Sequence, residues 1–185
     1  MSDLCIHHFE PLSRANGPGR RAVVWVQGCS LGCPGCFAPS THPFEGGEMV
    51  DPEDLADRIA TLSGVDGVTL TGGEPLQQRD ALIEFLRCLR RRTRLSVIVF
   101  TGYSWDELMR IPDAQTLLLL VDAVIAGRYE RDLGPVSGLL SSTNQTLHLL
   151  SRRFAKADFD VAPEAEVIIT SDGEVLISGI GPPVS

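Results

Sequence analysis

Three cysteines, Cys29, Cys33 and Cys36, lie close together in the stretch CSLGCPGCF. Thiolate ligands suit both zinc and iron–sulfur clusters. A structural zinc site normally has four protein ligands, whereas three ligands with one open position are typical of a reactive metal centre. Glycines and prolines surround the three thiols and allow the backbone to wrap closely around a bulky group. The spacing therefore predicts a reactive metal site in this loop.

Other potential ligands leave an alternative open, because a zinc site could be completed by Cys5, His7 or His8. Without such a site, Cys5 is an incidental thiol near the N-terminus. Cys88 follows Phe85 by three residues on a predicted helix, which is the place of a small core residue. Only the three clustered cysteines are therefore expected to do chemistry.

The elements that must position these cysteines alternate between strands and helices. Continuous β-branched apolar runs predict buried strands. An N-cap aspartate followed by proline, an apolar stripe and a capping box predict helices. Such alternation is typical of parallel βαβ units, so the sequence predicts an α/β fold. The predicted strands are 22–26, 67–71, 95–101 and 122–126, and the predicted helices are 51–62, 80–92, 104–109 and 113–120.

A β-hairpin is predicted near the C-terminal end, where EVIIT and VLISG flank a turn at Ser171–Gly173. It would close an edge of the main sheet or form a small appendage over about residues 164–181. A chain of 185 residues is long enough to bury a core of its own. We therefore expect one domain over residues 1–185, with its core at about 17–150.

Two further polar loops follow predicted strands. The motif Gly72-Gly73-Glu74-Pro75 ends strand 67–71, and Thr101-Gly102 ends strand 95–101. Ligands of parallel α/β sheets bind at the carboxyl ends of the strands. Both loops are therefore expected to face the cysteine loop, which follows strand 22–26. The alternative for each is an ordinary turn between a strand and a helix.

Composition narrows the classes of function. The net charge of −8 weighs against a nucleic-acid partner, because phosphate contacts need a basic surface. No apolar run approaches the roughly 20 residues that a membrane span needs. The start of the chain, MSDLCIHHFE, lacks the basic and apolar segments of a secretory signal. We expect a cytoplasmic protein without a membrane partner, and in that reducing compartment clustered cysteines are more often ligands than disulfides.

The spacing C-x3-C-x2-C, combined with GGEP at the next strand end, resembles the radical S-adenosylmethionine (SAM) superfamily. The resemblance implies that Cys29, Cys33 and Cys36 hold a [4Fe–4S] cluster whose open iron binds SAM. It also implies a reduced cluster that donates one electron to SAM, which cleaves into methionine and a 5′-deoxyadenosyl radical. The protein then supplies position, exclusion of water and electrostatics to its cofactors.

The same resemblance implies a set of SAM contacts. Gly73 and Glu74 would meet the methionine amino group, where a carboxylate accepts a charge-assisted hydrogen bond. Phe37 would shield the cluster or the adenine side. For Ser142 and Asn144, which form a polar patch with Gln145, the alternative is an ordinary turn and cap. The full implied set is Gly35, Cys36, Phe37, Gly72, Gly73, Glu74, Thr101, Gly102, Ser142 and Asn144.

A narrower resemblance covers about residues 17–150. GPGRRAVVWVQGCSLGCPGCF, TGYSWDEL, VDAVIAGRYERDL and SSTNQTLHLL resemble blocks of activating proteins for anaerobic ribonucleotide reductases and other glycyl radical enzymes. Most superfamily members have an aromatic residue before the third cysteine, whereas Gly35 here is typical of the reductase activators. The resemblance implies an abbreviated, partial (β/α) barrel. It also implies a protein substrate that loses a hydrogen atom from a glycine, and a reductant such as flavodoxin or ferredoxin.

Departures from that family pattern leave other functions open. Ala126 stands where the family commonly has an acidic residue, and Thr143 is inserted into its serine–asparagine–glutamine block. One alternative is a radical SAM enzyme that modifies a peptide or a small molecule. Another is a non-catalytic iron–sulfur or zinc protein used in electron transfer or assembly.

Overall fold

The computed structural model describes residues 2–134, 138–163, 165–169, 173 and 175–179. Within these residues, seven strands form one sheet in the order β3-β1-β2-β4-β5-β6-β7, and β8 pairs with β9 separately. No helix in this part of the chain is long and apolar enough to cross a membrane. The strands are β1 (Leu4–Ser13), β2 (Arg21–Val26), β3 (Glu48–Val50), β4 (Gly67–Gly72), β5 (Ser96–Thr101), β6 (Ala123–Ala126), β7 (Thr146–Leu149), β8 (Ala165–Ile169) and β9 (Val175–Gly179).

The centre of the large sheet is parallel and its flanks are antiparallel. β2, β4, β5 and β6 run parallel, which confirms the four predicted strands and the α/β class. β1 and β3 on one side and β7 on the other are antiparallel additions that the sequence did not predict. β2 and β4 end in register, with Val26 opposite Gly72, and β5 and β6 end with Thr101 opposite Ala126. The loops after these strands therefore leave from one edge of the sheet.

Two of the predicted helices, α1 and α3, begin at side-chain caps that the sequence predicts. The Asp51 carboxylate accepts hydrogen bonds from the amides of Glu53 and Asp54, and Ser104 with Glu107 forms the predicted capping box. The α-helices are α1 (Pro52–Ala60), α2 (Arg79–Arg92), α3 (Trp105–Leu108), α4 (Ala114–Leu118) and α5 (Lys156–Asp160), and the 3₁₀ turns are η1 (Pro39–Thr41), η2 (Pro75–Gln78) and η3 (Arg131–Leu133).

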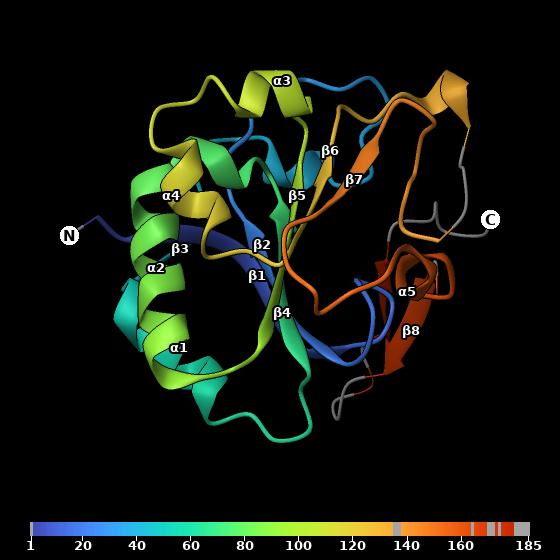
Figure 1. Ribbon diagram of the computed structural model, residues 1–185. Coiled ribbons are helices and arrows are strands. Elements are labelled where there is room, and N and C mark those ends of the chain that lie inside the picture. The colour runs from blue at the N-terminus through green and yellow to red at the C-terminus, as the bar shows by residue number, and fades with distance from the viewer. Residues whose placement is uncertain (1, 135–137, 164, 170–172, 174, 180–185) are drawn as a thin grey trace.

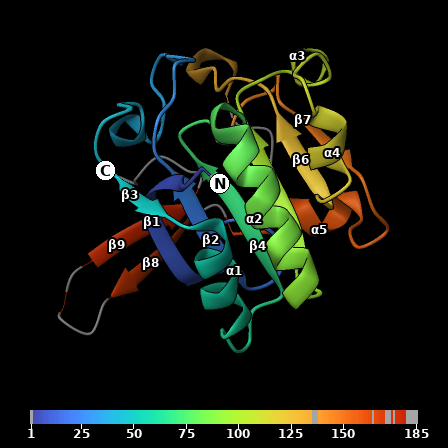
Figure 2. The same cartoon turned by 90° about the vertical axis from the view of Figure 1, so that its left-hand side faces the viewer.

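Apolar side chains bury both faces of the parallel strands. α1, α2 and α4 cover one face (Figures 1 and 2), and the larger core cluster includes the predicted α2 stripe and Cys88. On β5, Val97 and Val99 belong to this cluster, whereas Ile98 points to a second cluster with Phe159 of α5. Continuous apolar strands are the expected result of burial on both faces.

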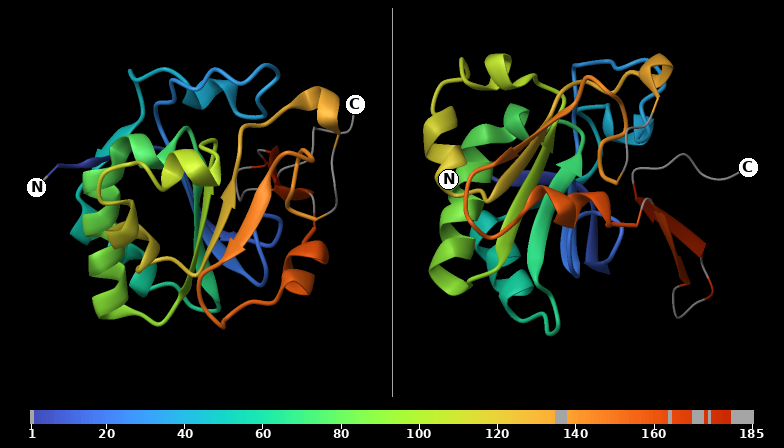
Figure 3. Two further views of the ribbon diagram at one scale, coloured as in Figure 1. Left: turned by 45° about the horizontal axis from the view of Figure 1, so that its top comes forward. Right: turned by 45° about the vertical axis from the view of Figure 1, so that its right-hand side comes forward.

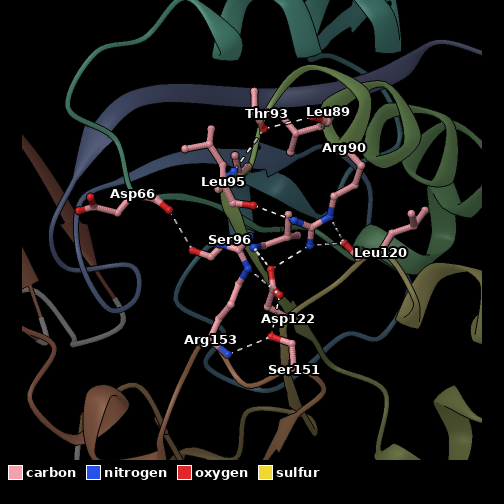
Figure 4. A network of polar contacts seen from close by, with 12 residues as sticks. Asp66, Leu89, Arg90, Thr93, Leu95, Ser96, Leu120, Asp122, Ser151 and Arg153 are labelled. Atoms are coloured by element: carbon pink, nitrogen blue, oxygen red, sulfur yellow. Dashed lines mark hydrogen bonds and ion pairs between the residues drawn. The ribbon is translucent and has the colours of Figure 1, made fainter.

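A buried carboxylate ties the strands together at their amino ends. Asp122, just before β6, accepts hydrogen bonds from Arg90 of α2 at 2.8 Å and from the amide of Val97 at 2.8 Å. Ser151 donates a third at 2.7 Å, and Arg153 lies 3.5 Å away (Figure 4). These contacts hold the pKa of Asp122 below its ordinary value against the opposing effect of burial, which is the largest single influence.

The predicted hairpin is confirmed as β8 and β9, in a two-stranded sheet apart from the large one. Figure 3 shows it beside the body of the molecule. Ser171 and Asp172 of the predicted turn lie outside the described residues. Glu166 accepts hydrogen bonds from the Arg14 amide, and Ser178 accepts one from the Asn16 side chain at 2.7 Å. These contacts tie the hairpin to the segment between β1 and β2.

Candidate functional site

The cysteine loop and the GGEP loop are joined by their backbones at the carboxyl edge of the sheet, at the top of Figure 1. The Gly73 amide donates to the Val26 carbonyl at 2.8 Å, and the Glu74 amide donates to the Gly28 carbonyl at 2.9 Å. A Cβ atom on Gly73 would lie 2.3 Å from that Gly28 oxygen. Glycine at position 73 is therefore required for the two loops to meet this closely.

Backbone hydrogen bonds hold the cysteine loop where it leaves β2, and a side chain of η2 holds it further along. The Gly28 amide donates to the Thr41 carbonyl at 2.7 Å, and the Cys29 amide donates to the His42 carbonyl at 3.0 Å. Gln77 of η2 exchanges hydrogen bonds with Ser30, accepting from its amide at 3.1 Å and donating to its hydroxyl at 2.7 Å. The sequence analysis did not single out Gln77, although its place directly after GGEP pointed to the same edge.

The three clustered cysteines line one cavity of about 150 Å³ and are half-buried, free thiols. Burial is the main reason that the pKa of Cys29 and the pKa of Cys36 are raised. A backbone hydrogen bond at Leu31 acts in the opposite direction on Cys29, and one at Ala38 does so on Cys36. The Cys36 amide donates to the Cys33 carbonyl at 3.2 Å, which makes a turn between these two cysteines.

Neither Cys5 nor His7 reaches this cavity. The Cys5 thiol donates to the Gly46 carbonyl at 3.4 Å, and His7 Nδ1 lies 2.7 Å from the side-chain oxygen of Gln27. His8 stacks on Trp25, with the ring centres 5.4 Å apart. Among the described residues, no three histidine, cysteine, aspartate or glutamate side chains are arranged to hold one metal ion. The three side chains named for the zinc alternative therefore lie away from the described lining of this cavity.

Glu74 is almost fully buried, with 1% of its surface exposed, and joins two strand ends. Its carboxylate accepts hydrogen bonds from the Leu76 amide at 3.0 Å, the Thr101 hydroxyl at 2.8 Å and the Gly102 amide at 2.8 Å. Burial raises its pKa to about 7, although these three donors and the charge of Arg128 act in the opposite direction. Three residues that the sequence placed at one site therefore form one hydrogen-bonded unit.

Most of the expected site residues surround the cavity, but not all of them. Those that line it are Cys29, Cys33, Cys36, Phe37, Gly72, Gly73, Glu74, Thr101 and Gly102. Gly35, Ser142 and Asn144 are not part of its lining, whereas Ser141 and Gln145 are. The Asn144 side chain donates to the Arg128 carbonyl at 2.8 Å, and Ser142 accepts from the Glu130 amide at 3.3 Å. These two residues support the segment that follows β6.

Comparison with known proteins supports a common origin of this site. Residues 15–148 match the family model described as a 4Fe-4S single cluster domain. The anaerobic ribonucleoside-triphosphate reductase-activating protein of enterobacteria phage T4 is 31% identical over 142 residues, covering 74% of this chain and 88% of the phage protein. The protein of the same name from Salmonella typhimurium is 31% identical over 156 residues, covering 78% of this chain and 97% of the relative.

This chain belongs to the radical SAM activating-enzyme family. It is accordingly an enzyme of the oxidoreductase class. A pyruvate formate-lyase-activating enzyme from Clostridium pasteurianum is also similar, with 34% identity over 121 residues. That match covers 62% of this chain and 50% of the relative.

Two residues of the segment after β6 contact the cysteine loop. The sequence had not identified either of them as a site residue. The Tyr129 ring packs on Phe37 with centres 4.3 Å apart, and both line the cavity. The Arg131 guanidinium lies against Gly35. Both belong to the block VDAVIAGRYERDL, so the signal was present, but only the tertiary structure shows that this block meets the cysteines.

A salt bridge fixes the same segment from its other side. Arg128 donates to the carboxylate of Glu107, in α3, at 2.7 Å. This hydrogen bond is the main reason that the pKa of Glu107 falls to about 2. A neighbouring contact between Trp105 and His148, with rings stacked 3.8 Å apart, also joins α3 to β7. The segment after β6 is therefore held in place by a contact outside the cavity.

Proposed function

We propose that this chain activates a glycyl radical enzyme, using a [4Fe–4S] cluster and SAM bound in the cavity at the carboxyl edge. The observation that carries the proposal is that three thiols of one loop line the same cavity as Gly73 and Glu74. Two relatives, matched over 88% and 97% of their own length, are named as activating proteins of an anaerobic ribonucleoside-triphosphate reductase. The corresponding partner for this chain is a protein with an accessible glycine.

The donor set of the cavity fits such a cluster. A structural zinc site normally has four protein ligands, whereas the described cavity lining contains three cysteines. Cys29, Cys33 and Cys36 would instead each hold a different iron, and a thiol-only set suits iron–sulfur clusters. When bound, the two cofactors supply one-electron cleavage of SAM to methionine and a 5′-deoxyadenosyl radical, which takes a hydrogen atom from the substrate.

Glu74 is the residue that we expect to accept a hydrogen bond from the amino group of SAM. A carboxylate offers about four lone-pair sites, and Glu74 uses three of them on its neighbours. One site remains for a charge-assisted hydrogen bond with an ammonium group. Because the donors of Thr101 and Gly102 are occupied by Glu74, we infer that these two residues position the carboxylate. The backbone of Gly72 and Gly73 forms the adjoining wall.

Residues on the opposite wall would enclose the rest of SAM. We infer that Phe37, packed on Tyr129, shields the cluster or adenine side, and that the backbone of Gly35 and Cys36 lies next to it. Among the described residues, the Asn144 side-chain oxygen is a buried acceptor without a hydrogen-bond partner. Such an acceptor is costly to leave unpaired. Because Asn144 lies outside the cavity lining, we propose that it meets a part of SAM that extends beyond this cavity. Ser142 would keep its segment in place.

The arrangement of the strands supports the remaining expectations. The parallel strands β2, β4, β5 and β6, with the cavity at their carboxyl edge, support an abbreviated barrel of the radical SAM type. We infer one domain over 1–185, with its core at 17–150 and the hairpin as an appendage. Flavodoxin or ferredoxin would serve as the reductant.

The decisive experiment is anaerobic reconstitution with iron and sulfide, followed by dithionite and SAM and by mass spectrometry for 5′-deoxyadenosine. We expect the product with the wild type and with Cys5→Ala, whose thiol lies outside the loop. Cys33→Ala should give none. A correctly formed four-iron cluster that yields no 5′-deoxyadenosine would contradict the radical SAM mechanism, and one bound zinc per chain without iron would contradict the cluster itself.

The partner is tested separately, by mixing the reduced, SAM-loaded protein with a glycyl radical enzyme from the same organism. We expect a protein-bound radical signal in electron paramagnetic resonance spectra of the partner. Its glycine-to-alanine variant is the control and should give none. Production of 5′-deoxyadenosine with no radical on any such partner would point instead to a peptide or small-molecule substrate.

A further inference from the structure

Arg131 covers the outer side of the cysteine loop at Gly35, the residue before the third cysteine. The Nε, Cζ and Nη2 atoms of Arg131 lie 2.6 to 2.7 Å from the position that a Cβ atom on Gly35 would occupy. Gly35 has a φ of +74°, which favours glycine. The guanidinium therefore fills the space that a side chain at position 35 would take, between Cys33 and Cys36.

In the part of the chain that the structure describes, the charge of Arg131 has no carboxylate paired with it. Among the described residues, Arg131 takes part in none of the ion pairs, whereas Arg128 is paired with Glu107 at 2.7 Å. The adjacent Glu130 accepts a hydrogen bond from Asn144 at 3.0 Å, and Asp132 is exposed to solvent. The cysteine loop itself, CSLGCPGCFA, carries no charged side chain. Arg131 thus places a positive charge against this loop at Gly35.

The backbone on both sides of Arg131 is held in place. Tyr129 packs on Phe37 of the cysteine loop, and the Leu133 amide donates to the Glu130 carbonyl at 3.1 Å within η3. The Asn144 side chain holds the Arg128 carbonyl at 2.8 Å. The position of the guanidinium against Gly35 is therefore supported by contacts that do not involve its charge.

We propose that Arg131 is a positioning residue whose charge raises the reduction potential of the cluster, an inference that rests on the proposed function. Three thiolates give the cluster site a negative charge, and reduction adds one more. A cation in contact with the loop stabilises the reduced state more than the oxidised state. The Arg131 guanidinium touches the backbone at Gly35, which is much closer than the Debye length of about 8 Å at physiological ionic strength, so salt screens its charge at the loop only weakly. The reductant would then transfer its electron more readily.

The test is a potentiometric titration of the reconstituted cluster, followed by electron paramagnetic resonance, in the wild type and in variants of Arg131. Arg131→Met keeps much of the apolar stem and removes the charge, so we expect a lower midpoint potential. Arg131→Lys keeps the charge and should stay near the wild type. Arg94→Met removes an exposed charge at the opposite edge of the sheet and should leave the potential unchanged.

The outcomes separate this inference from the proposed function. If the wild type forms no four-iron cluster, the proposed function is wrong and the inference fails with it. If clusters form and Arg131→Met has the wild-type potential, only the inference is overturned, because a residue that merely packs on the loop would alter cluster retention without moving the potential. Arg131→Gln replaces the methionine variant if that protein does not fold, with the same lowered potential expected.

Discussion

A buried charged side chain at each edge of the parallel sheet, Arg21 at the amino edge and Glu74 at the carboxyl edge, has a different use. At the amino edge Arg21 is fully buried, and at the carboxyl edge Glu74 is 1% exposed. Burial is the main cause of both pKa shifts: it lowers the pKa of Arg21 to about 9 and raises that of Glu74 to about 7. Neither side chain forms an ion pair within the described part of the chain.

The two side chains differ in how many of their hydrogen-bonding sites are used within the protein. Arg21 directs all five of its N–H groups to neutral oxygens: the Thr69 hydroxyl, the carbonyls of Pro18 and Val68, and both oxygens of Ser96. Glu74 keeps one acceptor site and borders a cavity. The amino edge is therefore a closed structural junction, whereas the carboxyl edge retains polar capacity for a ligand.

The largest effect is expected from Arg21→Met, which would leave four buried oxygens and the partly buried Pro18 carbonyl without their donor. The loss of such a network should lower the free energy of unfolding by about 4 kcal/mol, measured by urea denaturation. Arg94→Met, at an exposed position near the same edge, should change it by no more than about 0.5 kcal/mol. Equal stability of the two variants would refute the idea that the amino edge depends on Arg21.

A pH-dependent effect should distinguish Glu74 from Arg21. The folded pKa of Glu74, about 7, lies above its ordinary value of 4.5, so the folded state binds the proton more tightly. The contribution of Glu74 to the free energy of unfolding is therefore fully present below about pH 4.5. As the pH rises to 7, this contribution falls by about 3 kcal/mol. The stability difference between the wild type and Glu74→Gln should shift by that amount over this range.

The same comparison of stability between pH 4.5 and 7, made with Arg21→Met, should give a different result. Arg21 stays charged throughout that range because its pKa of about 9 lies above it. The stability difference between the wild type and Arg21→Met should therefore be constant from pH 4.5 to 7. A flat profile for Glu74→Gln as well would show that Glu74 keeps an ordinary pKa in the folded state.

The smallest effect is expected from Gln77→Ala, which removes the hydrogen bonds to Ser30 on the exposed side of the cysteine loop. Because these groups remain accessible to water, the free energy of unfolding should fall by about 1 kcal/mol or less. Amide hydrogen exchange at Ser30 should nevertheless become faster. Gln115→Ala, on the exposed face of α4, is the matched control. Unchanged exchange at Ser30 would mean that the loop is held by its base alone.

The regular elements were predictable where one local pattern dominated. β-Branched runs identified the four parallel strands, and the caps at Asp51 and Ser104 marked the starts of α1 and α3. β1 was missed because its register shifts between Ile6 and His8 and again after Glu10, which interrupts simple alternation. β7 has four residues and no buried side chain, so it lacks a strong apolar signal.

The sequence by itself determined which residues could do chemistry here: three thiols at close spacing in a loop, and a Gly-Gly-Glu-Pro motif at the next strand end. Those are local properties of residue type and spacing. Only the tertiary structure decided that Glu74 takes its donors from Thr101 and Gly102 and that Arg131 lies on Gly35. Contacts between residues so far apart in the chain depend on how the sheet brings its loops together, which no local pattern records.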